Sequence, residues 1–169
     1  MPESQARDDR AASGSLLDDL YREVILDHYR SPRNRGSLDD PTCAADGVNP
    51  LCGDQIHLDV ALAGDTIEAL RFSGQGCSIS QASASMMTEQ VTGLDRPAAF
   101  AAVAAFQRLM LTGEPGDADL GDAEMLSGVA KFPARVKCAS LAWKTLEQAL
   151  GGVPSRAAVT TDERSSRDG

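Results

Sequence analysis

The chain has 169 residues, a formal net charge of −9 and only 4% aromatic residues. This length fits one domain with a sizeable core. The acidic balance argues against a nucleic-acid-binding protein, because no basic stripe is available to replace counterions around phosphates.

The first fourteen residues contain no apolar run of signal-peptide length, and nowhere do eighteen apolar residues follow one another. We therefore expect a cytoplasmic protein with no membrane partner. In a reducing compartment, the four cysteines are better explained as metal ligands or catalytic thiols than as two disulfides. An extracellular disulfide pair is the alternative.

Residues 1–13 lack periodicity and are predicted to be a disordered tail. Apolar residues then recur at helical spacing and predict a helix that ends before Pro32. His28 lies on its apolar stripe, where a histidine is more often packed than a ligand. Residues 33–52 are rich in Gly, Pro, Asp and Asn, which indicates a loop with one short edge strand near Cys43 to Val48.

A β-hairpin is predicted next. Residues 55–62 alternate between apolar and polar side chains, which places Ile56, Leu58, Val60 and Leu62 on one buried face and His57 and Asp59 on the other. Ala63, Gly64 and Asp65 form the turn, and residues 66–73 return as an antiparallel strand. The imperfect alternation of that second strand leaves room for a β-bulge.

Gly74 and Gly76 then predict a tight turn before a helix from about Ser78 to Thr92. Cys77 therefore lies at a helix N-terminus, where unpaired N–H groups and the helix dipole favour thiolate over thiol. Such a cysteine is prepared to act as a nucleophile or as a metal ligand. A buried capping cysteine is the structural alternative, and a phosphate cradle is disfavoured because no Gly-Lys-Ser/Thr follows.

Three further helices are predicted in the C-terminal half. The first begins after the cap Asp95 and has apolar positions at Phe100, Val103, Ala104, Phe106 and Met110. A surface loop over residues 112–119 and a short helix over residues 121–130 follow. The last helix opens at Pro133 and ends near Leu150. The single domain should span residues 14–151, followed by a disordered tail over residues 152–169.

Three thiols and one carboxylate stand at the ends of predicted elements. These are Cys52, Asp54, Cys77 and Cys138. Side chains at positions i and i+2 of an extended segment point the same way, so Cys52 and Asp54 could reach one ion. The set is a plausible tetrahedral zinc site, although no Cys-x-x-Cys pair supports it. Arg135 and Lys137 would moderate its excess negative charge, unless they are ordinary solvated charges.

Four segments in the right order resemble the SufU branch of the NifU/IscU family. They are LYREVILDHYRSPRNRG at 20–36, LCGDQIHL at 51–58, FSGQGCSISQASASMM at 72–87 and KFPARVKCASLAWKTL at 131–146. The resemblance covers residues 16–150. It implies an α+β domain, in which a three-stranded antiparallel sheet has helices packed on one face, and a part in iron–sulfur cluster biogenesis.

The resemblance also implies which residues bind metal. The family's ligand positions fall on Cys52, Asp54, Cys77 and Cys138, which would bind Zn²⁺. Lys137 stands where scaffold members of the family carry a histidine, and an extra segment from about Gly113 to Lys131 lengthens the interval before Cys138. Both differences favour a zinc-dependent sulfur carrier. Cys43 has no counterpart in the family pattern and is interpreted as an incidental thiol.

By resemblance, this carrier is a sulfurtransferase that accepts persulfide sulfur from a SufS-type cysteine desulfurase, activates it, and delivers the sulfur to other iron–sulfur assembly proteins. The partner would supply a replacement ligand that frees Cys52 for catalysis, while Asp54 would make ligand exchange easier. The alternatives are a scaffold that holds iron or a [2Fe–2S] cluster on the same four side chains, and a purely structural zinc module. Residues 20–35 and 132–135 are predicted to dock the desulfurase.

Overall fold

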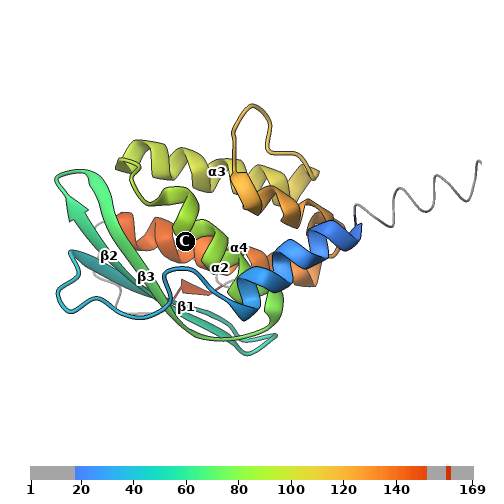
Figure 1. The fold of residues 1–169 in the computed structure, drawn as a ribbon, viewed down its shortest axis with the longest axis horizontal. Helices are drawn as coiled ribbons and strands as arrows, with labels where there is room; N and C mark the ends of the chain where they lie inside the picture. Colours follow the sequence, from blue (N-terminus) through green and yellow to red (C-terminus); the bar gives the residue numbers. More distant parts are fainter. Residues whose placement is uncertain (1–17, 152–158, 161–169) are drawn as a thin grey trace, which may run out of the picture.

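An antiparallel sheet of three main strands forms one side of the molecule. The computed structural model describes residues 18–151 and 159–160. The strands are β1 (Cys43–Asn49), β2 (Asp54–Ala63) and β3 (Thr66–Gln75), and the helices lie over one face of the sheet (Figure 1). This arrangement confirms the α+β fold class with helices packed on one face.

The β2–β3 hairpin follows the predicted alternation. Ile56, Leu58 and Val60 are buried, and the ladder pairs Leu58 with Phe72. The register shifts between Ala61, which pairs with Ala69, and Leu62, which pairs with Ile67. Glu68 is therefore the extra residue, and the bulge lies on the second strand of the hairpin, as predicted. This irregularity increases the local twist, and the pairing then resumes with Leu62 opposite Ile67 and Ala63 opposite Thr66.

The outer face of the hairpin is less open than the alternation predicts. Asp59 is only 5% exposed, because the loop before β1 covers it and the backbone N–H of Leu38 donates a 3.0 Å hydrogen bond to its Oδ2. His57 lies between two carboxylates, with Nδ1 2.7 Å from Asp46 Oδ1 and Nε2 2.8 Å from Asp59 Oδ1. Partial burial lowers the pKa of His57, but the hydrogen bonds and charges of Asp46 and Asp59 together outweigh it, so the pKa of His57 is raised.

A fourth, two-residue strand joins the edge of the sheet. β4 (Val159–Thr160) pairs in parallel with β1 and gives the strand order β3-β2-β1-β4. These two residues fall within the stretch that was predicted to be a disordered C-terminal tail, and there they pair with the edge strand instead. The rest of that tail, and the predicted N-terminal tail over residues 1–13, lie outside the described residues.

The helices agree closely with the predicted boundaries. Residues 18–30 are helical, and the predicted beginning of this first helix lies outside the described residues. The later elements are α2 (Ser78–Val91), α3 (Arg96–Thr112), the 3₁₀ helix η1 (Gly121–Lys131) and α4 (Pro133–Leu150). In η1, the buried residues Ala123, Leu126 and Val129 recur every third position, a spacing that lines one face of a helix with three residues per turn.

Helix α2 is the centre of the helical layer. It packs on β3, α4 and η1, while α4 covers β1 and β2 (Figure 1). Residues 80–88 are therefore buried without interruption, which explains why small residues dominate this stretch. The hydroxyl of Ser83 is bonded within the core: its Oγ donates to the carbonyl oxygen of Ala139 at 2.6 Å and accepts from Trp143 Nε1 at 3.0 Å.

Helix α3 lies farther from the sheet and packs on α4 and η1 (Figure 1). Its Phe106 stacks on Trp143, with ring centroids 4.4 Å apart. Phe100 and Ala104, two of the apolar positions named from the sequence, are exposed. Because α3 has packed neighbours on only one side, its apolar residues outnumber the buried positions available to them.

Among the described residues, no helix combines the length and the apolar character that a membrane span requires.

Candidate metal centre

The turn between β1 and β2 holds the first two predicted ligands. Gly53 has φ +71°, a left-handed conformation that favours glycine, and it separates Cys52 from Asp54. Cys52 is exposed in the turn, whereas Asp54 begins β2 and is 0% exposed. The prediction that both lie on one extended segment is therefore wrong, and the turn is what sets their geometry.

Cys77 is the N-cap of α2, as predicted. Its Sγ accepts a 3.5 Å hydrogen bond from the backbone N–H of Ser80. The backbone N–H of Cys77 donates to Asp54 Oδ1 at 2.9 Å, and Cys77 Sγ lies 3.9 Å from Asp54 Oδ2. The start of α2 and the start of β2 are thus joined through the Asp54 carboxylate.

Cys138 approaches from the second turn of α4. It is 0% exposed, and its Sγ lies 3.4 Å from Cys52 Sγ. The side-chain amide of Asn49, also buried, is 3.8 Å from the same sulfur. Burial raises the pKa of the Cys138 thiol, and hydrogen bonds with Cys52 and Asp54 raise it further.

These groups converge on one centre. The ligand atoms of Cys52, Asp54 and Cys138 all lie within 4.8 Å of one another. Cys77 is not part of this closest set, but its Sγ lies 3.9 Å from Asp54 Oδ2. Ligands of a tetrahedral zinc ion stand about 3.7 Å apart, and the distances of 3.4 and 3.9 Å at this centre bracket that value. The donor set therefore fits a thiophilic divalent cation.

Two glycines permit this approach. A Cβ atom on Gly76 would lie 2.5 Å from Asp54 Oδ1, and a Cβ atom on Gly74 would meet the backbone carbonyl of Gln55. Both glycines were predicted to be turn residues. Asn49 was not predicted to belong to the site, yet its backbone carbonyl accepts from the N–H of Cys52 at 3.2 Å and its side chain faces Cys138. The Asn-Pro step before the Cys-Gly-Asp sequence is the turn pattern that could have indicated it.

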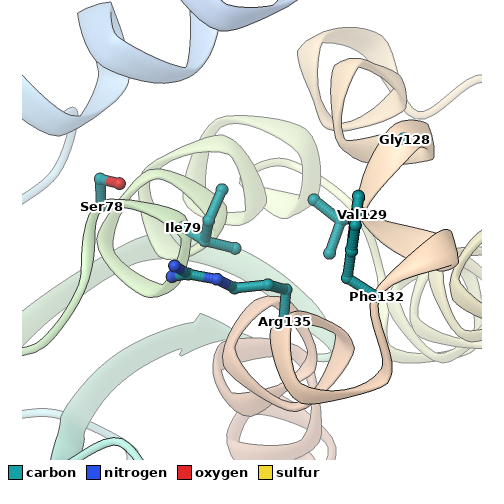
Figure 2. A pocket seen from close by; sticks show the side chains of 6 residues that line it. All are labelled: Ser78, Ile79, Gly128, Val129, Phe132 and Arg135. Atoms are coloured by element: carbon teal, nitrogen blue, oxygen red, sulfur yellow. The ribbon is translucent and has the colours of Figure 1, made fainter.

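The two predicted charge-moderating residues are placed differently. Arg135 is exposed and extends from the first turn of α4 towards Ser78 and Ile79 at the start of α2 (Figure 2). Lys137 is half-buried and directly precedes Cys138 in the chain. Arg135 thus places a positive charge near the residue that follows Cys77, and its charge-moderating role stays a prediction.

Cys43 does not take part in this centre. It begins β1 opposite Val60, whereas Asn49 ends the strand opposite Asp54. Six residues of extended chain separate the two ends by about 20 Å. Burial raises the pKa of the Cys43 thiol. These observations agree with the interpretation of Cys43 as an incidental, partly buried thiol.

An apolar groove begins beside the centre. It has a volume of about 660 Å³ and runs between the first helix, the start of α2, and η1. Its walls include Ile25, Ile79, Val129 and Phe132, and Phe132 is 60% exposed. A smaller pocket of about 320 Å³ continues it to Arg135 (Figure 2). The groove therefore brings together the two segments that were predicted to dock a partner.

Known proteins resemble this chain over most of its length. The zinc-dependent sulfurtransferase SufU of Bacillus subtilis is 52% identical over 135 residues, which cover 79% of this chain and 91% of that protein. The iron–sulfur cluster assembly scaffold protein IscU of Streptococcus pyogenes is 44% identical, with 80% and 86% of the two chains covered.

A solved structure also resembles this chain. A proposed iron–sulfur cluster assembly scaffold protein for the SUF system, from Fervidobacterium islandicum, has a TM-score of 0.72 and 36% identity, over 76% of this chain and 94% of that one. The family model for the NifU-like N-terminal domain matches residues 20–139. That match includes all three thiols and the carboxylate of the centre. The chain therefore belongs to the NifU-like N-terminal domain family.

Proposed function

We propose that this protein works in iron–sulfur cluster assembly as a zinc-dependent sulfur carrier, which accepts sulfur from the persulfide of a SufS-type cysteine desulfurase. Residues Cys52, Asp54, Cys77 and Cys138 would hold the zinc ion, and bound zinc would keep the thiols in the thiolate form. The similarity to the sulfurtransferase of Bacillus subtilis supports this assignment. We place the protein in the cytoplasm.

One observation carries the proposal. Cys52 is the exposed thiol of the centre, while Cys138 and the Asp54 carboxylate are fully buried. Only an exposed sulfur can meet the persulfide of another protein. The buried groups are suited to holding the ion and Cys52 to reacting.

The transfer itself is a thiol–persulfide exchange. The Cys52 thiolate attacks the terminal sulfur of the desulfurase persulfide, the S–S bond of that persulfide breaks, and the desulfurase cysteine leaves as a thiolate. Cys52 then carries the persulfide, and no external oxidant or reductant is required. Delivery to the next assembly protein repeats the same exchange with Cys52 as the leaving group.

The test is a persulfidation assay with desulfurase, cysteine and the purified protein. Cys52→Ala should abolish both persulfide on this protein and its stimulation of desulfurase turnover. Cys43→Ala is the matched control, because it removes a thiol about 20 Å away along β1, and it should change neither readout. If Cys52→Ala still stimulates turnover and still becomes persulfidated, Cys52 is not the acceptor.

The alternative function is a scaffold for a [2Fe–2S] cluster. The same side chains support it, and so does the 44% identity to the IscU scaffold protein of Streptococcus pyogenes. Metal analysis separates the two functions when the protein is purified without added metal. One zinc ion per chain and no visible absorbance support the carrier, and a brown, iron-containing protein supports the scaffold.

We further propose that the desulfurase docks on the apolar groove next to the centre. Exposed Phe132 would enter the interface, and Arg135 would contact an acidic residue of the partner. Phe132→Ala and Arg135→Glu should weaken desulfurase binding. Leu111→Ala is the control, because Leu111 is 84% exposed but does not line the groove. Unchanged binding of both groove variants would refute this docking site.

A further inference from the structure

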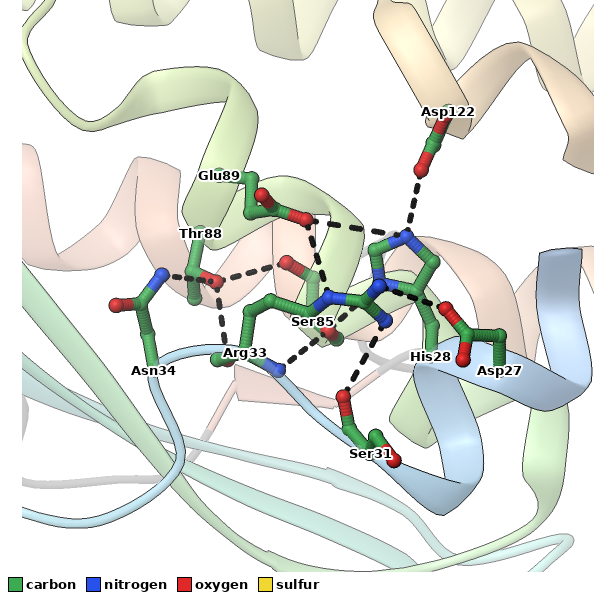
Figure 3. Close-up of polar contacts among 9 residues, drawn as sticks. All are labelled: Asp27, His28, Ser31, Arg33, Asn34, Ser85, Thr88, Glu89 and Asp122. Carbon is green, nitrogen blue, oxygen red and sulfur yellow. Dashed lines mark hydrogen bonds and ion pairs between the residues drawn. The ribbon is translucent and has the colours of Figure 1, made fainter.

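A second cluster of metal-binding side chains lies away from the thiols. It consists of His28 from the first helix, Glu89 from α2 and Asp122 from η1, whose ligand atoms lie within 4.8 Å of one another (Figure 3). His28 Nε2 is 2.8 Å from Asp122 Oδ2 and 3.9 Å from Glu89 Oε1. Glu89 and Cys77 lie about 18 Å apart along the axis of α2, so this cluster is separate from the thiol centre.

The histidine is held as a metal ligand would be. His28 is 0% exposed, and its other ring nitrogen, Nδ1, lies 2.7 Å from Ser85 Oγ. Metal-binding histidines almost always have their second nitrogen hydrogen-bonded in this way, which fixes the orientation of the ring. Nε2 points out of the core towards two half-exposed carboxylates (Figure 3). An ion there would keep open positions for water.

The hydrogen bonds of Ser85 are compatible with either state of the site. Its Oγ accepts from the backbone N–H of Arg33 at 2.9 Å, and a hydroxyl has two lone pairs and one proton. Without an ion, Ser85 can donate to Nδ1 while the Nε2 proton bonds Asp122. With an ion on Nε2, the ring proton resides on Nδ1 and is accepted by the second lone pair of Ser85.

The local charge is unbalanced. Among the described residues, the ion pairs of this cluster join three carboxylates to one guanidinium and one imidazole: Arg33 pairs with Asp27 and Glu89, and His28 pairs with Glu89 and Asp122. Arg33 binds Asp27 more closely, at 2.6 Å, than Glu89, at 3.5 Å. Two negative charges are therefore left uncompensated in this cluster, and a divalent cation would neutralise them.

We propose that His28, Glu89 and Asp122 form a second site for a divalent first-row transition ion, distinct from the thiol centre. One imidazole and two carboxylates with open coordination positions suit such an ion. Because the ligands come from the first helix, α2 and η1, a bound ion would fasten the first helix and η1 to the centre of the helical layer. Both elements also line the apolar groove.

The experiment uses Mn²⁺ as the probe and the full-length protein with its thiols occupied by zinc. Carboxylates suit Mn²⁺ and thiolates do not, so the thiol centre should not compete. The loss of the free Mn²⁺ signal in electron paramagnetic resonance gives stoichiometry and affinity. We expect one Mn²⁺ per chain, with affinity lowered about tenfold or more in Asp122→Asn and Glu89→Gln. Asp117→Asn removes the same charge from the exposed loop before η1 and should bind as the wild type.

A second readout locates the ion. Bound Mn²⁺ should broaden the imidazole resonances of His28 before those of His57, which lies on the sheet. Equal affinities in all three variants would overturn the proposal, and so would broadening centred on His57 or broadening that spreads evenly over the surface. In that case the His28–Asp122 hydrogen bond is only a tie between the first helix and η1.

Discussion

Gly76 offers a sharp test of how the metal centre is built. A Cβ atom at this position would lie 2.5 Å from Asp54 Oδ1 and 3.1 Å from Asp54 Cγ. Real Cβ contacts are essentially never that short, so Gly76→Ala must displace the carboxylate. The backbone of Gly76 is not in the left-handed region, so alanine adds no backbone strain and the contact with Asp54 is the whole perturbation.

The displacement has two consequences. Asp54 is fully buried, and its Oδ1 accepts the 2.9 Å bond from the Cys77 N–H. Losing a buried hydrogen bond to a charged acceptor costs about 2 kcal/mol, which corresponds to a fall in Tm of about 4–8 °C for a domain of this size. Shifting a carboxylate ligand should also lower zinc affinity by about 10- to 100-fold.

The assay is a thermal melt together with zinc transfer to a chromophoric chelator. Gly128→Ala is the matched control, because no atom lies within 4 Å of a Cβ atom at Gly128, and it should leave both readouts unchanged. A Gly76→Ala protein that melts and holds zinc like the wild type would show that Asp54 does not occupy the position on which the proposed centre depends.

Two further predictions concern the sheet and α3. The pKa of His57 in the folded protein is raised above its usual value by Asp46 and Asp59. The hydrogen bonds of His57 to these two carboxylates therefore stabilise the fold fully below about pH 6.5. This stabilisation decreases as the pH rises through the raised pKa. Denaturant unfolding across this range should show that loss for the wild type and a smaller one for His57→Gln, and identical pH profiles would contradict the reasoning. Asp95 accepts from the N–H of Ala98 at 2.9 Å as the N-cap of α3, so Asp95→Ala should lower the free energy of unfolding by about 1 kcal/mol; Asp95→Asn, which keeps the cap, should lose much less.

Local patterns were sufficient to predict most elements of the fold. The alternation in residues 55–62 predicted β2, and the caps Cys77 and Asp95 predicted the starts of α2 and α3. Each of these features depends on backbone geometry and on neighbours within a few residues. A short stretch of sequence is therefore enough to predict it. Sequence could not predict that Phe100 is exposed, because burial on α3 depends on which of its sides meets α4 and η1.

The order of the amino acids already indicates which groups are available for chemistry: three thiols and a carboxylate, each next to a glycine, a turn or a helix that begins at a proline. Their relative positions depend on how distant elements pack, because Cys52 and Cys138 are 86 positions apart in the chain and yet their sulfurs lie 3.4 Å from each other. The packing of α4 on β1 and β2 produces that contact, and it leaves Cys52 exposed while burying Cys138. The cluster around His28 has the same origin, since its three ligands come from separate elements that meet only when the helical layer has packed.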